Sequence, residues 1–338
     1  MPSPGGCISL QLSLTLTLRG RATANSGGGW NTLTGYLTPP PLPSLTRDDA
    51  HSLPTWRAAY SDRTAAMMAT FSWLAYLPFD PTGKTMPSDG HKTKAMPNGP
   101  ADLELRLKEG GFELAQIFDW DNVQAFLAVN AAEFAVLAFR GTANREDWRI
   151  DLNAITVPMD GFPGVRVHKG FWETFLAQRD QIKAAVDRYV SNDLGLYITG
   201  HSLGGALAQI ASAVLERDNL AACYTYGSPR VATMRFDVDV KCPNYRLINH
   251  WDLVPGVPLP VIMGYYHAGD ARLLARDPTV LFRRDHWVPF WLWAQLRAVV
   301  GWGITHRLFN IANHMIWNYL SQLKVIAAER AKPAADRR

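Results

Sequence analysis

Residues 194–215 read LGLYITGHSLGGALAQIASAVL, and this stretch decides the fold. Its first part, Leu194–Thr199, is a short apolar run typical of a buried strand, and its last part, Ala206–Leu215, carries apolar residues at helical spacing. The turn between them reads GHSLGG and matches the pattern G-x-S-x-G. This order of strand, glycine-rich turn and helix predicts that Ser202 lies on a sharp bend at the C-terminal edge of a sheet.

The residues around the bend suit a nucleophile. Gly200 and Gly204 allow neighbouring backbone to approach where a Cβ would clash, and His201 completes the predicted elbow. The following helix directs its first N–H groups toward the bend, which favours developing negative charge. One donor to such a charge would be the backbone N–H of Leu203, the residue after Ser202. A turn of this composition can also serve only to connect a strand to a helix, and this alternative stays open.

Strand-like and helix-like runs flank the bend. Three apolar runs with short connections predict an antiparallel meander, at Phe112–Phe118, Val123–Val129 and Phe134–Phe139. Helical spacing extends over 56–77 and 171–190, and two further buried-type strands are expected at 221–226 and 245–248. Because strands and helices alternate, we expect an α/β fold with a mostly parallel central sheet flanked by helices and an antiparallel edge meander.

Composition bounds the organisation of the chain. The 338 residues are 47% hydrophobic and 19% charged, which is ample for a core, and a net charge of +4 does not indicate a nucleic-acid partner. We expect residues 1–46 to be a poorly structured N-terminal extension with a Gly/Pro-rich linker. Residues 47–328 are expected to form the folded domain and residues 329–338 a charged tail.

The three cysteines argue against a disulfide scaffold.

The sequence signals for targeting and for a membrane span are weak. Leucines alternate with polar residues over 7–18, which indicates a strand rather than a signal-peptide core, although Ala22-Thr23-Ala24 resembles a cleavage site. The Trp-rich segment 287–304 is interrupted by Pro, Arg and Gly and is short for a membrane span. We expect a soluble protein, cytoplasmic rather than secreted, with peripheral lipid association left open and no transmembrane span. The oligomeric state is not determined.

Several motifs in order resemble the class 3 lipase family, the fungal-lipase-like α/β-hydrolases. The resemblance covers roughly residues 55–325 and implies an α/β-hydrolase fold for residues 47–328. It also implies a serine carboxylic ester hydrolase that acts on lipid esters, as an acylglycerol lipase does. The motifs that carry it are AFRGT at 138–142, DW at 147–148, DL at 151–152, VHKGF at 167–171, ITGHSLGG at 198–205, YGSPRV at 226–231 and NHWDLVP at 249–255.

An acid must orient the base that activates the serine. In α/β-hydrolases the chain order is Ser, acid, His. Asp252 directly follows the strand expected at 245–248, and the resemblance places the family's acid there, whereas Asp237 and Asp239 precede that strand. A turn-capping role for Asp252 before Pro255 is the alternative.

The chain order leaves four candidates for the base, which are His267, His286, His306 and His314. His267 lies in a segment, 265–269, that is similar to a late sheet strand of the family. By resemblance His314 opens the last helix, where the family's catalytic histidine lies, and we expect it to be the base. His306 and His286 are kept as reserves, and a merely buried or capping role for His314 stays open.

The resemblance also implies a second oxyanion donor and a lid. Thr142 would complete the oxyanion hole with Leu203, and residues 143–163 would correspond to the lid. Apolar residues of the lid and of the Trp-rich segment could face lipid or could simply be buried. We therefore expect a lipid or other ester substrate, with contact at a lipid–water interface as one option.

No sequence motif indicates a cofactor. A zinc-binding H-E-x-x-H, paired C-x-x-C motifs, a Walker loop and a dinucleotide fingerprint are all missing from the sequence, so neither a cofactor nor a metal is expected. Two other functions stay open. The chain could be a phospholipase or another esterase on the same fold, or a catalytically silent interaction protein, because fold alone does not choose between them.

Overall fold

A computed structural model of the chain describes residues 40–51, 53, 59–77, 99–120, 123–141, 155–215, 217–249, 252–259, 263–274, 283–284 and 313–332. Several expectations lie outside these residues. They are the strand at 7–18, the cleavage-like site at 22–24, the first part of the lid at 143–154 and the Trp-rich segment at 287–304.

One edge of the central sheet is an antiparallel meander. Its strands are β1 (Glu113–Trp120), β2 (Val123–Asn130) and β3 (Phe134–Phe139), and each pairs antiparallel with the next. The connections are short enough for hairpins, which is why these strands run in alternate directions. The expected meander is confirmed.

The rest of the sheet is mostly parallel. The described sheet has the order β1-β2-β3-β6-β7-β8-β9-β10, in which β3 to β9 are parallel neighbours and β10 pairs antiparallel with β9. The added strands are β6 (Leu196–His201), β7 (Leu220–Tyr226), β8 (Asn244–Asn249), β9 (Asp270–Leu274) and β10 (Arg283–Arg284). β3, β6 and β8 are buried along their whole length, as strands covered on both faces are. The expected α/β fold is therefore confirmed.

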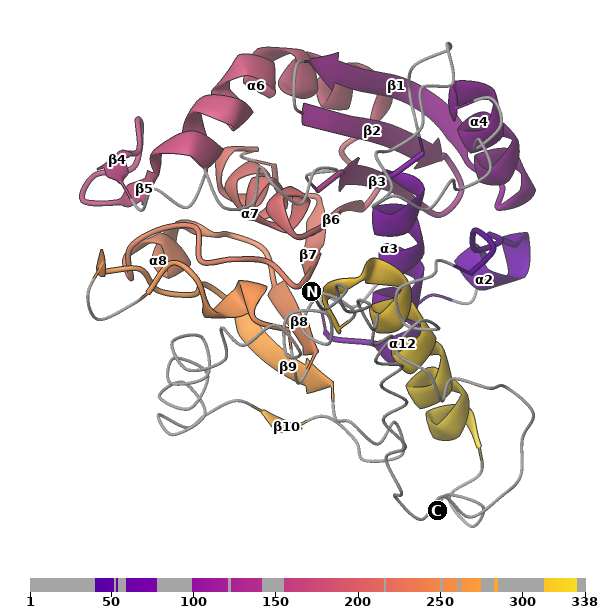
Figure 1. Cartoon of the computed structure of the whole chain (residues 1–338). Coiled ribbons are helices and arrows are strands. Elements are labelled where there is room, and N and C mark those ends of the chain that lie inside the picture. The colour runs from indigo at the N-terminus through magenta and orange to yellow at the C-terminus, as the bar shows by residue number, and fades with distance from the viewer. Residues whose placement is uncertain are drawn as a thin grey trace, which may run out of the picture.

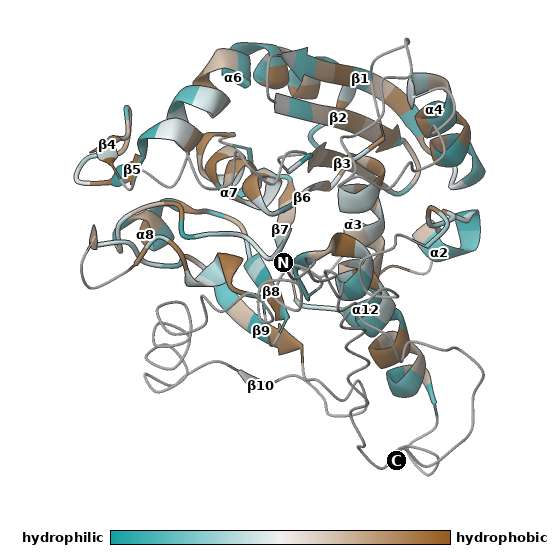
Figure 2. Cartoon of the chain, viewed as in Figure 1, coloured by the Kyte–Doolittle hydropathy of each residue, from teal (hydrophilic) through white to brown (hydrophobic). Residues whose placement is uncertain are grey.

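Helices cover both faces of this sheet (Figure 1). The helices α3 (Asp62–Leu74) and α12 (Ile316–Ala331) pack together over one apolar core, whereas α6 (Lys169–Tyr189) and α7 (Leu203–Val214) cover a second core. Successive residues of β3 divide between the cores, because Val136 joins the first and Leu137 the second. Figure 2 shows hydrophilic as well as hydrophobic residues along the outer helix α6, as expected for a helix with one buried face.

Smaller elements complete the described fold. They are α2 (Arg47–His51), α4 (Gly99–Glu109), β4 (Thr156–Pro158), β5 (Arg166–His168), α8 (Phe236–Asp239) and the 3-10 turn η1 (Val254–Gly256). α4 was not predicted, because its buried leucines, Leu103 and Leu107, form only a short apolar stripe.

Some element boundaries differ from the expected ones. α3 begins at Asp62, because the side chain of Ser61 caps its N-terminus. α7 begins at Leu203 rather than at Ala206, because the carbonyl of Ser202 already accepts the first helical hydrogen bonds. The late strand β9 follows the segment expected to form it, 265–269, since Gly269 has a positive φ of 84° and turns the chain there.

The described structure also reaches past the expected domain boundaries. Leu45 is buried in the core and α12 continues to Ala331. The division at residues 46 and 328 stays a prediction. No described helix combines the length and the apolar character that crossing a membrane requires.

Candidate active site

Ser202 occupies a strained backbone position between β6 and α7. Its φ is 58° and its ψ is −127°, and it is the one non-glycine with positive φ among the described residues. Such a conformation costs about 1–3 kcal/mol and persists only where the surroundings impose it. Here the Ser202 N–H donates to the carbonyl of Tyr226 at 2.9 Å, and the Ser202 carbonyl accepts from Gly205 at 2.9 Å. Strain at a serine between a strand and a helix is the geometry of a nucleophile elbow.

The two elbow glycines are required by close packing. A Cβ on Gly200 would lie 2.8 Å from the backbone nitrogen of Gly205, and a Cβ on Gly204 would lie 2.7 Å from the carbonyl carbon of Arg140. Real Cβ atoms essentially never come this close, so the first turn of α7 is pressed against the ends of β6 and β3. Leu203 is the first residue of α7, where backbone N–H groups have no partner within the helix.

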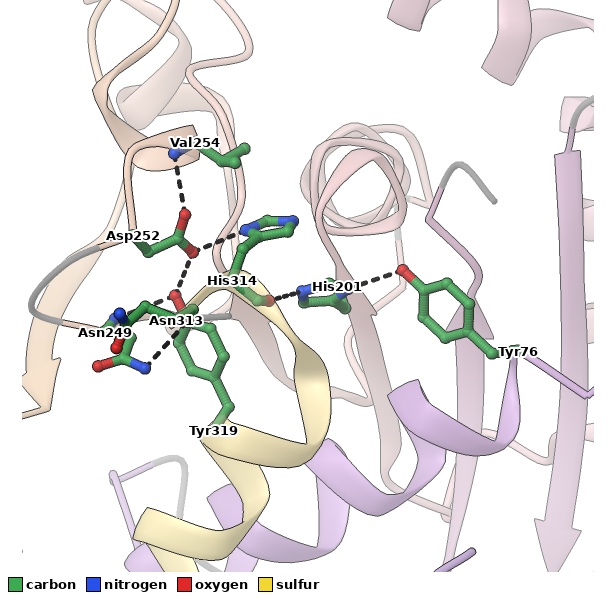
Figure 3. A network of polar contacts seen from close by, with 8 residues as sticks. All are labelled: Tyr76, His201, Asn249, Asp252, Val254, Asn313, His314 and Tyr319. Carbon is green, nitrogen blue, oxygen red and sulfur yellow. Dashed lines mark hydrogen bonds and ion pairs between the residues drawn. The ribbon is translucent and has the colours of Figure 1, made fainter. Parts of the chain in front are cut away.

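Asp252 and His314 form a buried hydrogen-bonded pair (Figure 3). The Nδ1 of His314 lies 2.8 Å from Oδ2 of Asp252, and the two residues are only 3% and 9% exposed. Because an ionised carboxylate can only accept, Nδ1 carries the proton, which leaves the Nε2 of a neutral ring as its basic nitrogen. This is the tautomer that a general base requires.

Two further donors hold the carboxylate of Asp252. Its Oδ1 accepts from the backbone N–H of Val254 at 2.9 Å, and its Oδ2 also accepts from the hydroxyl of Tyr319 at 2.6 Å. The Tyr319 oxygen in turn accepts from the backbone N–H of Asn249 at 3.0 Å. The turn-capping role and the pairing with His314 are thus both present, one on each oxygen. Sequence reasoning missed Tyr319, which no motif marked.

Gly227 lies beside this pair. It follows β7 with a positive φ of 58°, and a Cβ there would lie 2.5 Å from Oδ2 of Asp252 and 2.9 Å from Nδ1 of His314. The residue before it, Tyr226, binds the backbone of Ser202. Tyr226, the last residue of β7, and Gly227, which follows it, therefore bring the serine bend and the Asp–His pair to the same edge of the sheet. The turn-like sequence Gly-Ser-Pro after a predicted strand was the available signal for Gly227.

His201 lies on the other side of His314. Its Nε2 is 2.6 Å from the carbonyl oxygen of His314, its Nδ1 is 2.7 Å from the hydroxyl of Tyr76, and the two imidazole centroids are 4.5 Å apart (Figure 3). Burial, and then repulsion by the positive charge of a protonated His314, lower the pKa of His201 well below its ordinary value. The ring is therefore neutral near pH 7. Sequence reasoning placed His201 in the elbow but did not predict these contacts.

The other sequence candidates lie elsewhere. His267 donates through Nε2 to the carbonyl of Pro255 at 2.8 Å, and burial lowers its pKa. Asp237 and Asp239 lie on α8, where Asp237 accepts from the backbone of Gly269. The reserves His286 and His306 and the second oxyanion candidate, Thr142, lie outside the described residues.

The described part of the expected lid, residues 155–163, contains both exposed and buried apolar side chains. Ile155 is 56% exposed, whereas Met159 is buried against the core that contains α6 and α7. For a metal, the described residues offer no cluster of three or more His, Cys, Asp or Glu side chains.

Comparison with known families gives the same assignment as the motifs. Residues 136–262 match the family described as "Lipase (class 3)". Over these residues, called the lipase-family segment below, the chain is similar to the class 3 lipase family. The lipase-family segment contains Ser202 and Asp252 and ends before His314. His314 is therefore associated with the segment through its hydrogen bond to Asp252 and not through the family match.

Two relatives that match part of the chain carry lipase names. The secreted mono- and diacylglycerol lipase 1 of Fusarium solani is 35% identical over 170 residues, which cover 47% of this chain and 51% of that protein. A lipase of Rhizomucor miehei is 33% identical over 147 residues, which cover 40% of each chain. The chain thus spans about half the length, or less, of these relatives.

A solved structure shares the fold. The native propeptide complex of Rhizomucor miehei lipase superposes with a TM-score of 0.54 over 69% of this chain and 79% of that chain, at 24% sequence identity. At this identity the likeness establishes the fold alone.

Proposed function

We propose that the chain is a serine carboxylic ester hydrolase that acts on lipid esters. In this proposal Ser202 is the nucleophile, His314 the general base and Asp252 the carboxylate that orients the base. The observation that carries it is the 2.8 Å hydrogen bond between His314 and Asp252, made beside Gly227 at the end of the strand that also binds the backbone of Ser202. It supplies an oriented base at the sheet edge where the strained serine lies.

Acylation would begin with proton transfer from Oγ of Ser202 to Nε2 of His314. As Oγ bonds to the acyl carbon, the carbonyl electron pair moves onto oxygen and a tetrahedral oxyanion forms. The negative charge of Asp252 stabilises the imidazolium, and the donors from Val254 and Tyr319 keep this buried carboxylate satisfied. The oxyanion then re-forms the carbonyl, the bond to the alcohol oxygen breaks, and His314 returns the proton to the departing alcohol.

Deacylation would repeat these steps with water. His314 takes a proton from water as the water oxygen bonds to the acyl carbon, and the bond to Ser202 then breaks. The serine oxygen recovers its proton from His314 and the carboxylic acid leaves. No step consumes a cofactor.

The oxyanion would be held by two donors. We assign one to the backbone N–H of Leu203 at the start of α7, where the helix dipole also favours negative charge. We assign the other to Thr142, the residue after Gly141, shortly after the end of β3. In other hydrolases, removal of one such donor lowers turnover by about 10²–10³.

Acylglycerols are the proposed substrate class. The names of the Fusarium solani and Penicillium relatives, secreted mono- and diacylglycerol lipases, support this class. They also favour a secreted location over the cytoplasmic one expected from the sequence.

The test is a comparison of wild type with Ser202→Ala on p-nitrophenyl esters of graded chain length. We expect hydrolysis by wild type, labelling by a fluorophosphonate, and loss of both in the variant. The control is Ser212→Ala, which removes another buried serine hydroxyl, on α7, and should retain activity. Equal activity in Ser202→Ala and wild type would refute the proposal, and wild type with neither activity nor labelling would favour the silent interaction protein.

A substrate panel separates the esterase classes. Mono-, di- and triacylglycerols, phospholipids and short soluble esters are offered at equal ester concentration. Preference for acylglycerols, with a rate that jumps when the substrate exceeds its solubility, supports the proposed class. Preference for phospholipid or for soluble esters identifies the alternatives.

A further inference from the structure

His201 uses both of its ring nitrogens to join two parts of the chain that are distant in sequence. It is 3% exposed and is the last residue of β6, directly before Ser202. A backbone carbonyl can only accept, so the contact to the carbonyl of His314 requires a proton on Nε2. In the neutral ring Nδ1 then accepts, and the hydroxyl of Tyr76 is its donor at 2.7 Å.

Tyr76 extends this chain of contacts to the end of β3. Its hydroxyl lies against Gly141, since a Cβ on that glycine would overlap the oxygen. Burial raises the pKa of Tyr76, and the charge of Arg140 and a backbone hydrogen bond from Gly141 oppose this rise in part. Gly141 directly precedes Thr142, the residue assigned above as an oxyanion donor. The position of a Cβ on Gly141 is also 3.1 Å from Cβ of Ser202.

We propose that His201 is a positioning residue, resting on the proposed function, that ties the backbone of the base His314 to the β3 end beside the oxyanion site through Tyr76. Ser202 directly follows His201 and its Cβ lies close to Gly141, so the separation of the two tied parts would set how well Oγ of Ser202 meets both the base and the oxyanion donors. A displacement of 1 Å in such a geometry can reduce turnover about 10²-fold.

The charge state of His201 suits this role. During catalysis His314 becomes a cation, and the centroid of the His201 ring is 4.5 Å from it. A second cation there would oppose proton transfer to the base. The groups around His201 are His314, the hydroxyl of Tyr76 and the ring of Tyr319 at 6.2 Å, and among these described neighbours there is no carboxylate in contact to stabilise a charge. The lowered pKa of His201 is consistent with this environment.

A merely structural histidine would need only its volume. The test therefore compares His201→Phe, which keeps a ring but no hydrogen bond, with His201→Gln, whose amide nitrogen can still donate to the carbonyl of His314. Tyr76→Phe removes the other link. The matched control is His267→Phe, because His267 is also neutral and also donates through Nε2 to a backbone carbonyl, at 2.8 Å.

For a soluble p-nitrophenyl ester we expect kcat of His201→Phe to fall about 10–100-fold with KM nearly unchanged, as for a misplaced catalytic group. His201→Gln should recover most of the loss, and Tyr76→Phe should lie between them. His267→Phe should lose thermal stability to a similar extent and keep its kcat. The proposal is overturned if His201→Phe keeps wild-type kcat, if Gln is no better than Phe, or if the His267 control loses kcat equally.

A second readout does not depend on activity. The proton shared by Nδ1 of His314 and Asp252 should give a strongly deshielded NMR resonance in wild type and in His201→Gln. It should shift or broaden in Tyr76→Phe and His201→Phe. An unchanged resonance in both would overturn the positioning role. If Ser202→Ala were fully active, the proposed function would fail while this measurement still decided the role of His201. Should His201→Phe not fold, the Gln and Tyr76 variants carry the same comparison.

Discussion

Tyr319 donates a hydrogen bond to Asp252 across 67 residues of sequence, and the two oxygens are 2.6 Å apart. The accepting atom is Oδ2, which also binds the ring of His314. Tyr319 of α12 therefore holds the carboxylate of Asp252, and the proposed base, His314, lies just before the start of the same helix.

Replacement of Tyr319 by Phe removes one donor from a buried carboxylate and leaves the ring volume in place. We expect kcat to fall about tenfold and the free energy of unfolding to fall by about 1.5–3 kcal/mol, since the hydrogen bond is made to a charged group. Steady-state kinetics and urea unfolding measure both. Tyr265→Phe is the control, because this buried hydroxyl bonds instead to the carbonyl of Ile155. An undiminished kcat in Tyr319→Phe would contradict the expectation.

Gly227→Ala should disrupt the Asp–His pair itself. The new Cβ would lie 2.5 Å from Oδ2 of Asp252, and φ at this position is 58°. We expect activity to fall at least about 100-fold, because the pair must move to accommodate the methyl group. Gly264→Ala is a matched control, since φ there is 70° and nothing lies within 4 Å of its Cβ. That variant should show the backbone destabilisation alone, and equal activity in the two variants would exclude the steric explanation.

Ser202→Gly should be more stable than Ser202→Ala, although both variants should lose activity. Glycine adopts φ near 58° without strain, whereas alanine at the same position retains the strain. After allowance for the more flexible unfolded chain, we expect Ser202→Gly to exceed Ser202→Ala in free energy of unfolding by about 1 kcal/mol. Both variants lack the hydroxyl, so their difference reports the backbone and not the lost side chain. Equal stability of the two would mean that the bend stores no strain.

Acid should destabilise the fold through two buried histidines. The pKa values of His201 and His267 lie well below the ordinary value of 6.5. Below about pH 6.5 the unfolded chain therefore binds protons that the folded chain does not, and the free energy of unfolding falls as pH decreases, by at most about 1.4 kcal/mol per pH unit for each histidine.

This pH dependence can be checked by urea unfolding at pH 7.5 and pH 5.5. His267→Phe should reduce the loss of stability between the two values. The control is His51→Gln, because an exposed ion pair with Glu133 raises the pKa of His51 and its contribution has the opposite sign. An equal loss in wild type and His267→Phe would show that His267 does not contribute.

Sequence predicted the fold well where its signals are local. The strand, bend and helix around Ser202 occupy consecutive residues, and each has its own periodicity or turn chemistry. The position of Asp252 followed from the end of a strand. α4 was missed because two buried leucines give too short a stripe to distinguish a helix from a loop.

The support around the candidate site could not be predicted in this way. The contacts of His201 join residues 125 and 113 positions apart, and nothing in the residues between them records that the chain returns to the same point. Tyr319 looks like one more apolar position of an amphipathic helix until its hydroxyl is seen against Asp252. Long-range polar contacts of this kind depend on the final packing of the layers and not on local patterns.

The two halves of the candidate centre belong to opposite layers of the molecule. Ser202 begins the helix that covers one face of the sheet, while His314 precedes the helix that covers the other face. Because the sheet separates the two helical layers, the halves can meet only at an edge of the sheet. Loosening α12 would therefore move the proposed base away from Ser202 while leaving the serine bend in place.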